Sequence, residues 1–357
     1  MSKPSILVMA GGTGGHIFPG LAVAQYLRVC GWNVSWLGNK SGMEYRLVQA
    51  HHFPFEAVEF SGLRGKGMKA KLMLPINLVR ACLQSWKIMR RLKPSVVLGM
   101  GGYITFPGGL ISRLLKRPLV LHEANSVAGT ANQALAKIAM RTLTGFPETI
   151  QNAEWVGNPI RESFDAIESP SKRYQTRDGR LSILVVGGSL GAAALNETVP
   201  AALALIDKEA RPHVIHQAGE KHLADLERRY AQFDVVADIR SFIDDMPTAY
   251  AQADLVICRA GAMTVSEIAA CGVASCLIPF PFAIDDHQTG NARFLADADA
   301  AVLLPQKNLN PQDLASMIQN MSRDNLRLMA ERAHALAKPH ATRRVAEVCA
   351  DCAGVGV

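Results

Sequence analysis

Aromatic residues are scarce in this sequence, and so are long apolar segments. Phe, Trp and Tyr make up only 6% of the 357 residues, whereas 49% are hydrophobic, so the cores should be aliphatic. Charged residues amount to 19% and the mean hydropathy is +0.10, a balance that excludes long disordered regions. At roughly 100–200 residues per domain, the length predicts two domains.

No apolar segment suits a membrane-spanning helix. The longest uncharged stretch, residues 94–112, has about the right length, but two prolines and five glycines interrupt it. The apolar run Ile6–Ala10 is too short for a signal peptide. Seven scattered cysteines are typical of reduced thiols, and the CxxC pair of Cys349 and Cys352 has no second pair to complete a zinc site. The sequence predicts a cytoplasmic protein.

Acidic residues are absent from Phe60 to His122, a stretch that holds 12 basic ones. Residues 1–160 carry a net charge of +12, and residues 161–357 carry −5. Such a patch attracts an anionic partner: nucleic acid, a phosphorylated substrate or an acidic lipid surface. The basic residues alternate with Leu, Ile and Met rather than with stacking aromatics, so nucleic acid is not favoured.

Two segments that start 177 residues apart share one design: a strand, a glycine turn and a helix. Ile6–Ala10 leads into Gly11–Gly15 and a helix expected from about Leu21 to Val29. Ile183–Val186 leads into Gly187–Gly191 and a helix expected from Ala192 to about Ile206. Further strand candidates alternate with helices at 33–37, 96–98, 119–121 and 141–144, and at 214–216, 235–237, 255–257, 274–278 and 301–303. The pattern predicts two Rossmann-like α/β domains that face a cleft, with a hinge at 157–159.

The first glycine loop does not fit a dinucleotide site, because Ile17 replaces the third glycine and residues 34–38 lack an acidic side chain for the ribose. It does supply backbone N–H groups at a helix N-terminus, which suit phosphate oxygens. His16 lies at the helix entry. It could be a packing or capping residue, but beside a bound anion we favour a general base.

The second half repeats this anion-binding arrangement. Its glycine loop adds the hydroxyl of Ser189, and a later turn at Gly261 precedes Thr264 and Ser266 in the first turn of a helix. Glu267 could be a capping-box residue. In a nucleotide site, its two oxygens suit the vicinal hydroxyls of a ribose, and its charge disfavours phosphate there.

Eight motifs, in this order, resemble those of the MurG family of glycosyltransferases over residues 6–347. They are GGTGGH from Gly11, GGY from Gly101, HEAN from His122, GNPIR from Gly157, GGS from Gly187, FIDDM from Phe242, TVSE from Thr264, and His287-Gln288 with Asn291-Ala292. The resemblance implies the type B glycosyltransferase fold. It also implies transfer of N-acetylglucosamine from UDP-N-acetylglucosamine to lipid I, giving lipid II for peptidoglycan synthesis.

The resemblance also implies the site residues. UDP-N-acetylglucosamine would contact Thr13, Gly14, Gly15, Asn125, Arg161, Ser189, Ile243, Ala262, Met263, Thr264, Val265, Ser266, Glu267 and Gln288. Gly101, Gly102, Tyr103 and Glu123 would contact the acceptor. His16 is the predicted base, with Glu123 in reserve. Residues 1–160, joined by a C-terminal helix at about 338–357, would bind acceptor and membrane, and residues 161–337 would bind the UDP-sugar.

The sequence departs from the family pattern at four positions. Ala124 and Leu190 each stand where the family commonly has Gln, Ala274 stands where it has Pro, and His287 replaces the first of two glutamines found in some members. No charged group is lost, but Leu190 removes an amide that could reach the donor. Asp297-Ala-Asp299 has metal-motif spacing at an alanine-rich helix end, and we expect neither a metal nor a cofactor.

Two other functions fit the same glycine-loop pattern. A UDP-N-acetylglucosamine 2-epimerase of the same fold would need no acceptor site, which leaves the basic and apolar surface unexplained. A non-catalytic nucleotide-sugar binding protein would not need His16.

That surface comprises the loop 65–71 and a helix to about residue 92, whose apolar stripe is Ile76, Val79, Leu83 and Trp86. We expect Leu72–Lys93 to bind an anionic membrane surface reversibly, as a peripheral protein on the cytoplasmic face of the inner membrane.

Overall fold

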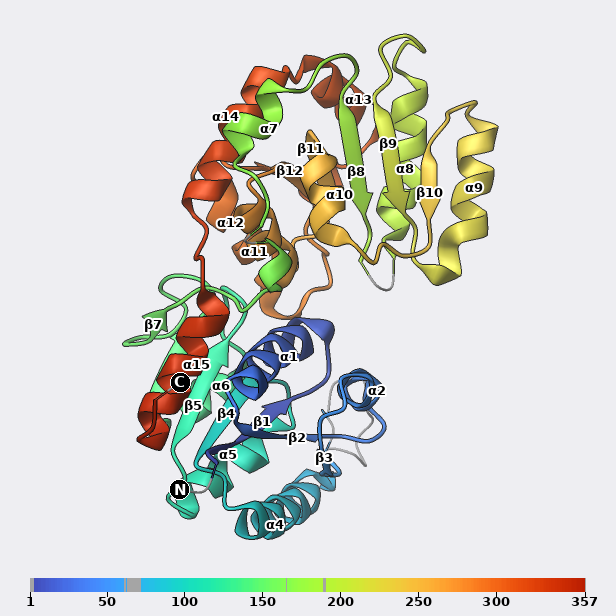
Figure 1. Ribbon diagram of the computed structural model, residues 1–357. Helices are drawn as coiled ribbons and strands as arrows, with labels where there is room; N and C mark the ends of the chain where they lie inside the picture. Colours follow the sequence, from blue (N-terminus) through green and yellow to red (C-terminus); the bar gives the residue numbers. More distant parts are fainter. Residues whose placement is uncertain (1–2, 61, 63–71, 165, 189–190, 357) are drawn as a thin grey trace. The chain divides into compact units, whose positions relative to one another are not determined.

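The computed structural model describes residues 3–60, 62, 72–164, 166–188 and 191–356. The chain forms two compact units, one of residues 1–161 with 340–357 and one of residues 162–339 (Figure 1). Each unit is an α/β structure whose strands are all parallel. The α/β class expected from the alternating pattern is therefore confirmed in both halves.

The N-terminal unit has a seven-stranded sheet in the order β3-β2-β1-β4-β5-β6-β7. Its strands are β1 (Ser5–Ala10), β2 (Asn33–Gly38), β3 (Phe55–Ala57), β4 (Val96–Gly101), β5 (Leu119–Glu123), β6 (Arg141–Thr144) and β7 (Glu154–Trp155). Its helices are α1 (Gly14–Val29), α2 (Met43–Ala50), α4 (Leu74–Leu92), α5 (Thr105–Leu114), α6 (Thr130–Ala136) and α15 (Ala341–Ala353).

Both faces of this sheet are covered, as expected for a parallel sheet. Because side chains alternate along a strand, Ile6 and Val8 of β1 pack with α1 and α15, while Leu7 and Met9 pack with α4 and α5. The C-terminal helix α15 thus belongs to the core of the N-terminal unit. Its Val345 and Cys349 are fully buried there, and Arg344 forms an ion pair with Glu154 of β7.

The C-terminal unit has a six-stranded sheet in the order β10-β9-β8-β11-β12-β13. Its strands are β8 (Ser182–Val186), β9 (His213–Gln217), β10 (Asp238–Arg240), β11 (Leu255–Cys258), β12 (Ala274–Leu277) and β13 (Val302–Leu303). Its helices are α7 (Pro170–Gln175), α8 (Ala193–Ala204), α9 (Leu223–Gln232), α10 (Met246–Gln252), α11 (Ala262–Cys271), α12 (His287–Ala296), α13 (Pro311–Asn320) and α14 (Arg323–Ala335).

Buried polar groups tie this second core together. Asp254, just before β11, accepts hydrogen bonds from Arg177 and from the backbone N–H of Ser182. His216 of β9 lies between the side chains of Tyr230 and Asn196, at 2.9 and 3.1 Å. Desolvation lowers the pKa of His216 to about 3, so this imidazole is neutral at physiological pH.

Two local predictions were wrong. The edge strand expected at 235–237 is β10 instead, because the chain leaves α9 through Asp234 at φ +52° and must first return to the sheet. Helix α1 begins at Gly14 rather than near Leu21, with Pro19 inside it. The hinge expected at 157–159 lies just before residues 161 and 162, where the two units divide, and there Asn158 is buried and donates to the carbonyl of Ala124.

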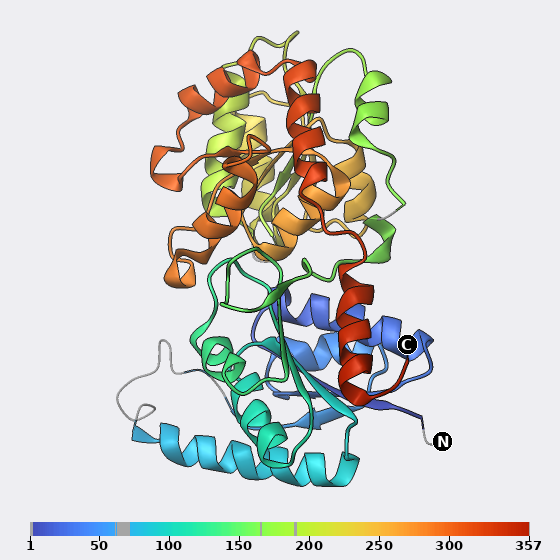
Figure 2. The ribbon, with the colours of Figure 1, turned by 90° about the vertical axis from the view of Figure 1, so that its left-hand side faces the viewer.

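Helix α4 lies along the outside of the N-terminal unit, and Figure 2 shows one side of it facing away from the rest of that unit. It packs beside α5 through Ala81, Ser85, Ile88 and Met89. Within the described part of the chain, no helix has both the length and the apolar character needed to cross a membrane.

Candidate functional site

The sheet order reverses at two places, between β1 and β4 and between β8 and β11. In open parallel sheets, ligands bind outside the carboxyl ends of the strands at such switch points. The first glycine loop follows β1, and the second follows β8. The topology therefore puts each loop that the sequence singled out at the binding edge of its own sheet.

The N-terminal switch point is built from two glycine segments in contact. Helix α1 begins at Gly14 with Thr13 as its N-cap, so its first N–H groups have no carbonyl partner within the helix. Gly101 and Gly102, at the end of β4, have φ values of +105° and +86°. A Cβ on Gly102 would lie 2.3 Å from the carbonyl oxygen of Gly11, so only glycine permits this approach.

His16 lies in the first turn of α1, against the end of β4. Its Nδ1 is 3.3 Å from the carbonyl oxygen of Gly11 and 3.4 Å from Oγ1 of Thr13. A Cβ on Gly101 would lie 2.8 Å from its Cδ2. With Nδ1 turned to the loop, the half-buried ring is held beside both glycine segments, the arrangement required of a group that acts on a ligand bound there.

The sequence did not predict a role for Glu44, whose carboxylate is hydrogen-bonded to the first glycine loop. Glu44 begins α2 and is only 2% exposed. Its two carboxylate oxygens accept hydrogen bonds from the backbone N–H groups of Gly12 and Asn39, at 3.4 and 3.0 Å. A Cβ on Gly11 would lie 2.6 Å from Oε1, so the glycine lets the carboxylate reach the loop. The N–H of Gly12 is therefore committed to Glu44 and not to a ligand.

Glu123, at the end of β5, organises the loop that follows it. Its buried carboxylate accepts hydrogen bonds from the backbone N–H and side-chain amide of Asn125, from the N–H of Gly129 and from the amide of Asn132. Both carboxylate oxygens are engaged by these neighbouring groups, so this geometry does not favour Glu123 as the reserve base. Its contact with the acceptor stays a prediction.

The neighbouring His122 is fully buried, and burial is the main cause that lowers its pKa. Its Nε2 donates to the carbonyl of Gly157 at 2.9 Å. Ala124, one of the four departures from the family pattern, is also fully buried. Its side chain therefore does not reach a ligand at this edge.

The C-terminal switch point centres on the start of α11. Gly261 is the N-cap, and the first N–H groups of the helix lie at the end of β11. Ala262 and Val265 are buried, so they can offer a ligand only backbone groups, whereas Met263, Thr264, Ser266 and Glu267 are partly exposed. The helix start is held from α12, where the buried Asn291 donates to the carbonyl of Ala260 at 3.1 Å.

Glu267 lies one turn into α11. Its Oε2 is 3.5 Å from the hydroxyl of Tyr250, a residue of α10 that is buried. Burial and the nearby carboxylate raise the pKa of Tyr250, so its hydroxyl remains a donor. This contact holds one edge of the Glu267 carboxylate toward α10.

The remaining predicted residues differ in their burial and in their hydrogen-bond partners. Ile243 follows β10 with a buried side chain, so any contact with a base would use its backbone. Gln288, on α12, accepts a hydrogen bond from the N–H of Phe280. Arg161 and Tyr103 are exposed. Ser189 and Leu190 lie outside the described residues, and Gly188 before them has φ +82°.

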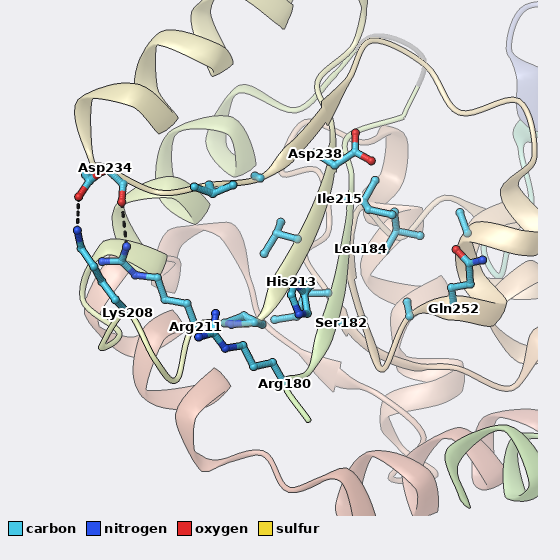
Figure 3. A pocket seen from close by; sticks show the side chains of 17 residues that line it. Arg180, Ser182, Leu184, Lys208, Arg211, His213, Ile215, Asp234, Asp238 and Gln252 are labelled. Atoms are coloured by element: carbon cyan, nitrogen blue, oxygen red, sulfur yellow. Dashed lines mark hydrogen bonds and ion pairs between the residues drawn. The ribbon is translucent and has the colours of Figure 1, made fainter. Parts of the chain in front are cut away.

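A cavity of about 540 Å³ in the C-terminal unit lies away from these loops (Figure 3). It is lined by the first residues of β8 and β9, Ser182 and His213, and hence opens at the amino ends of the strands. Its basic groups are largely engaged, because Lys208 pairs with the carboxylate of Asp234 and Arg211 donates to the carbonyl of the same residue. The cavity is not the candidate site.

Asp297 and Asp299, the pair with metal-motif spacing, lie in the turn that follows α12. Asp299 is 3.6 Å from the guanidinium of Arg332. Among the described residues, no three His, Cys, Asp or Glu side chains are grouped so that they could hold a metal ion.

Comparison with known proteins agrees with this architecture. The family model for the glycosyltransferase family 28 N-terminal domain matches residues 6–144, and that for the C-terminal domain of the same family matches residues 182–347. A relative from Polynucleobacter asymbioticus is 82% identical over the full length of both chains. One from Paraburkholderia phymatum is 57% identical over 99% of this chain and 96% of its own.

Both relatives are named UDP-N-acetylglucosamine–N-acetylmuramyl-(pentapeptide) pyrophosphoryl-undecaprenol N-acetylglucosamine transferase. The crystal structure of Acinetobacter baumannii MurG, at 38% identity, superposes with a TM-score of 0.86 over 97% of this chain and 99% of its own. This chain therefore belongs to glycosyltransferase family 28 and, within it, to the MurG family. The resemblance stated from the motifs is confirmed.

We predict that Glu44→Gln lowers the free energy of unfolding of the N-terminal unit by about 1–3 kcal/mol, because the new amide group faces backbone donors that the carboxylate accepted. Tryptophan fluorescence during urea unfolding measures this unit alone, since all four tryptophans lie in residues 1–161. The exposed Glu148→Gln is the control for the same loss of charge. Equal unfolding curves for Glu44→Gln and the unsubstituted chain would contradict the supporting role.

Proposed function

We propose that this chain transfers N-acetylglucosamine from UDP-N-acetylglucosamine to the C4 hydroxyl of the N-acetylmuramoyl unit of lipid I. The products are lipid II and UDP. The observation that carries the proposal is the 82% identity, over the full length, to a relative that is named for this transfer. The glycine loops at both switch points support it, because both substrates carry a diphosphate.

The donor is assigned to the C-terminal unit. The free N–H groups and positive end of α11 would take the charge that develops on the leaving UDP, without help from a metal. Glu267 would accept hydrogen bonds from the ribose hydroxyls, and the backbone at Ile243 would meet the uracil edge. Gln288 and Arg161 would contact the sugar and the diphosphate.

The acceptor is assigned to the N-terminal unit, with its diphosphate at the glycine loops of that unit, Gly101 and Gly102 included, while Gly14 and Gly15 would also contact the donor. His16 would take the proton from the C4 hydroxyl as its oxygen attacks the anomeric carbon. The bond from that carbon to the phosphate oxygen breaks, and UDP leaves with the electron pair. A single displacement of this kind inverts the anomeric centre.

The direct test supplies UDP-N-acetylglucosamine with a water-soluble lipid I analogue and measures disaccharide and UDP. Incubation with the donor alone is the control that tests whether the protein is a 2-epimerase instead. An epimer that forms from the donor without acceptor, and no disaccharide with it, would reverse the assignment. Both relatives are named as transferases, which does not favour an epimerase.

His16→Ala should lower kcat about 10²–10⁴-fold, the usual effect of losing a general base. Added imidazole should restore part of the rate, since it can accept the proton in place of the missing ring. His213→Ala, an exposed histidine of the other unit, is the control. Near-normal turnover by folded His16→Ala enzyme would assign the proton transfer to another group.

Glu267→Ala should raise KM for UDP-N-acetylglucosamine about tenfold or more and change kcat little, because a ribose contact is similar in the ground and transition states. A donor lacking the ribose hydroxyls should bind both forms equally weakly, whereas the natural donor distinguishes them. Glu227→Ala, exposed on α9, is the control. An effect on kcat alone would contradict this role.

The lipid-linked acceptor lies in a membrane, and we infer that α4 binds the membrane surface. Leu72, Ile76, Val79 and Leu83 are 57–73% exposed and follow one another at helical spacing. They form a second apolar face, opposite the side buried against α5. An exposed apolar stripe flanked by basic residues is typical of helices that lie in the membrane interface.

The charge on this helix is smaller than the sequence indicated. Arg80 and Arg91 form ion pairs with Glu59 and Glu56, which precede the acid-free stretch and lie beside α4. Lys87, Arg90 and Lys93 have no ion pair among the described residues, so three of the five cations at 80–93 keep their charge unpaired. Lys66, Lys69 and Lys71 lie outside those residues. Apolar insertion should therefore contribute more to binding than the composition suggests.

Replacing Ile76, Val79 and Leu83 together by Ser should weaken sedimentation with vesicles of anionic phospholipid about tenfold or more. Activity on a water-soluble acceptor should not change. The matched control replaces Leu205, Val236 and Leu328 by Ser, three exposed apolar residues of the C-terminal unit. Vesicle binding that persists in the α4 variant would assign the membrane contact to another surface.

A further inference from the structure

Gln217 lies at the binding edge of the C-terminal sheet. It is the last residue of β9, the strand between β8 and β10, and it pairs with Val186 on one side and Arg240 on the other. It is only 3% exposed. No motif marked it, because its neighbours His216 and Ala218 carry no recognisable ligand-binding pattern.

The side-chain amide of Gln217 joins two segments that lie beyond the ends of their strands. Its Oε1 accepts from the N–H of Gly188, and its Nε2 donates to the carbonyls of Gly188 and Ser241, each at 3.1 Å. Its own carbonyl accepts from the N–H of Gly187 at 3.4 Å. Both ends of one amide are thus used on backbone groups: two hydrogen bonds join it to Gly188 in the glycine turn, and one joins it to Ser241 after β10.

The backbone hydrogen bonds that tie these ends to β9 are made by the N–H of Gly187 and by the carbonyl of Arg240, and Gly188 and Ser241 each lie one residue beyond. Gly188 has φ +82°, a conformation that the paired amide contacts hold in place. Ser241 lies two residues before Ile243. The amide therefore sets the spacing between the glycine turn and the backbone at Ile243.

An apolar side chain would fill the same buried space, so packing alone does not explain the amide. Burying a polar group is unfavourable unless its hydrogen bonds are made, and here they are made only to these two segments. Under the proposed function, on which this inference rests, the turn faces the diphosphate side of the UDP-sugar and Ile243 faces the uracil. The two segments bind opposite ends of one nucleotide.

We propose that Gln217 is a positioning residue for the UDP-sugar, which fixes the distance between the diphosphate-binding turn and the uracil-binding segment. It touches neither the donor nor the reacting atoms. Its effect is preorganisation: a ligand that spans both segments gains from the fixed spacing, and a ligand that fills only one gains little.

The test uses Gln217→Glu, which keeps the size of the side chain and the acceptor for the N–H of Gly188. The second carboxylate oxygen faces the carbonyls of Gly188 and Ser241, so both donated hydrogen bonds are lost. Calorimetry should find UDP binding weakened about tenfold or more, with uridine and inorganic pyrophosphate each weakened less than about threefold. KM for UDP-N-acetylglucosamine should rise in parallel, with kcat changed less than about threefold.

Gln232→Glu is the matched control, the same substitution at an exposed position of the same unit. Gln217→Met removes all the amide contacts without adding charge, and it replaces the Glu variant if that chain does not fold. Equal UDP affinity in a folded variant and the unsubstituted chain overturns the inference. So does equal weakening of all three ligands, which is what general loosening of the unit would give. Failure of the unsubstituted chain to bind UDP would instead overturn the proposed function.

Discussion

An α-helix leaves its first backbone N–H groups without carbonyl partners, and the rest of this structure depends on where those groups are put. Helix α1 follows β1 and helix α11 follows β11, each at the point where the order of its sheet reverses. Both helices therefore begin at the carboxyl edge of a parallel sheet, with their positive ends open to an anion. A protein whose two substrates are both diphosphates can use the same device twice.

The glycine turns at these edges have no side chains that could fix their conformation, so neighbouring residues must do so. In the N-terminal unit, the buried carboxylate of Glu44 accepts from Gly12, and that of Glu123 accepts from four donors in the next loop. In the C-terminal unit, amides serve instead: Gln217 holds the turn at Gly188, and Asn291 holds the carbonyl before α11. Buried polar side chains thus make flexible turns rigid enough to bind a ligand.

Helix α4 has one face in the core and an apolar face in solvent. One of its faces completes the core beneath the sheet, and the opposite face leaves Ile76, Val79 and Leu83 in solvent. Two of its arginines are paired with Glu56 in β3 and with Glu59 just after that strand. The helix is therefore more apolar and less cationic on its outer side than its composition indicates, which changes the balance of forces expected at a lipid surface.

Much of the fold could be predicted from the sequence, because the apolar strands, glycine turns and amphipathic helices are local patterns. The repeated strand, turn and helix at Ile6 and Ile183 predicted two parallel α/β units, and the ordered motifs indicated the family. The positions of Thr264 and Glu267 on their helix followed from spacing alone. Each of these features depends on residues within one turn or one strand.

Tertiary structure decided whatever depends on contacts between distant segments. The sequence gives no sign that Glu44 lies under Gly12, that Glu59 pairs with Arg80, or that Gln217 joins Gly188 to Ser241. It placed the edge strand β10 three residues too early, because the start of an edge strand depends on its partner's register. Hydrogen bonds between groups 20 or more residues apart form only when the sheet order brings the strands together, and no local pattern records that order.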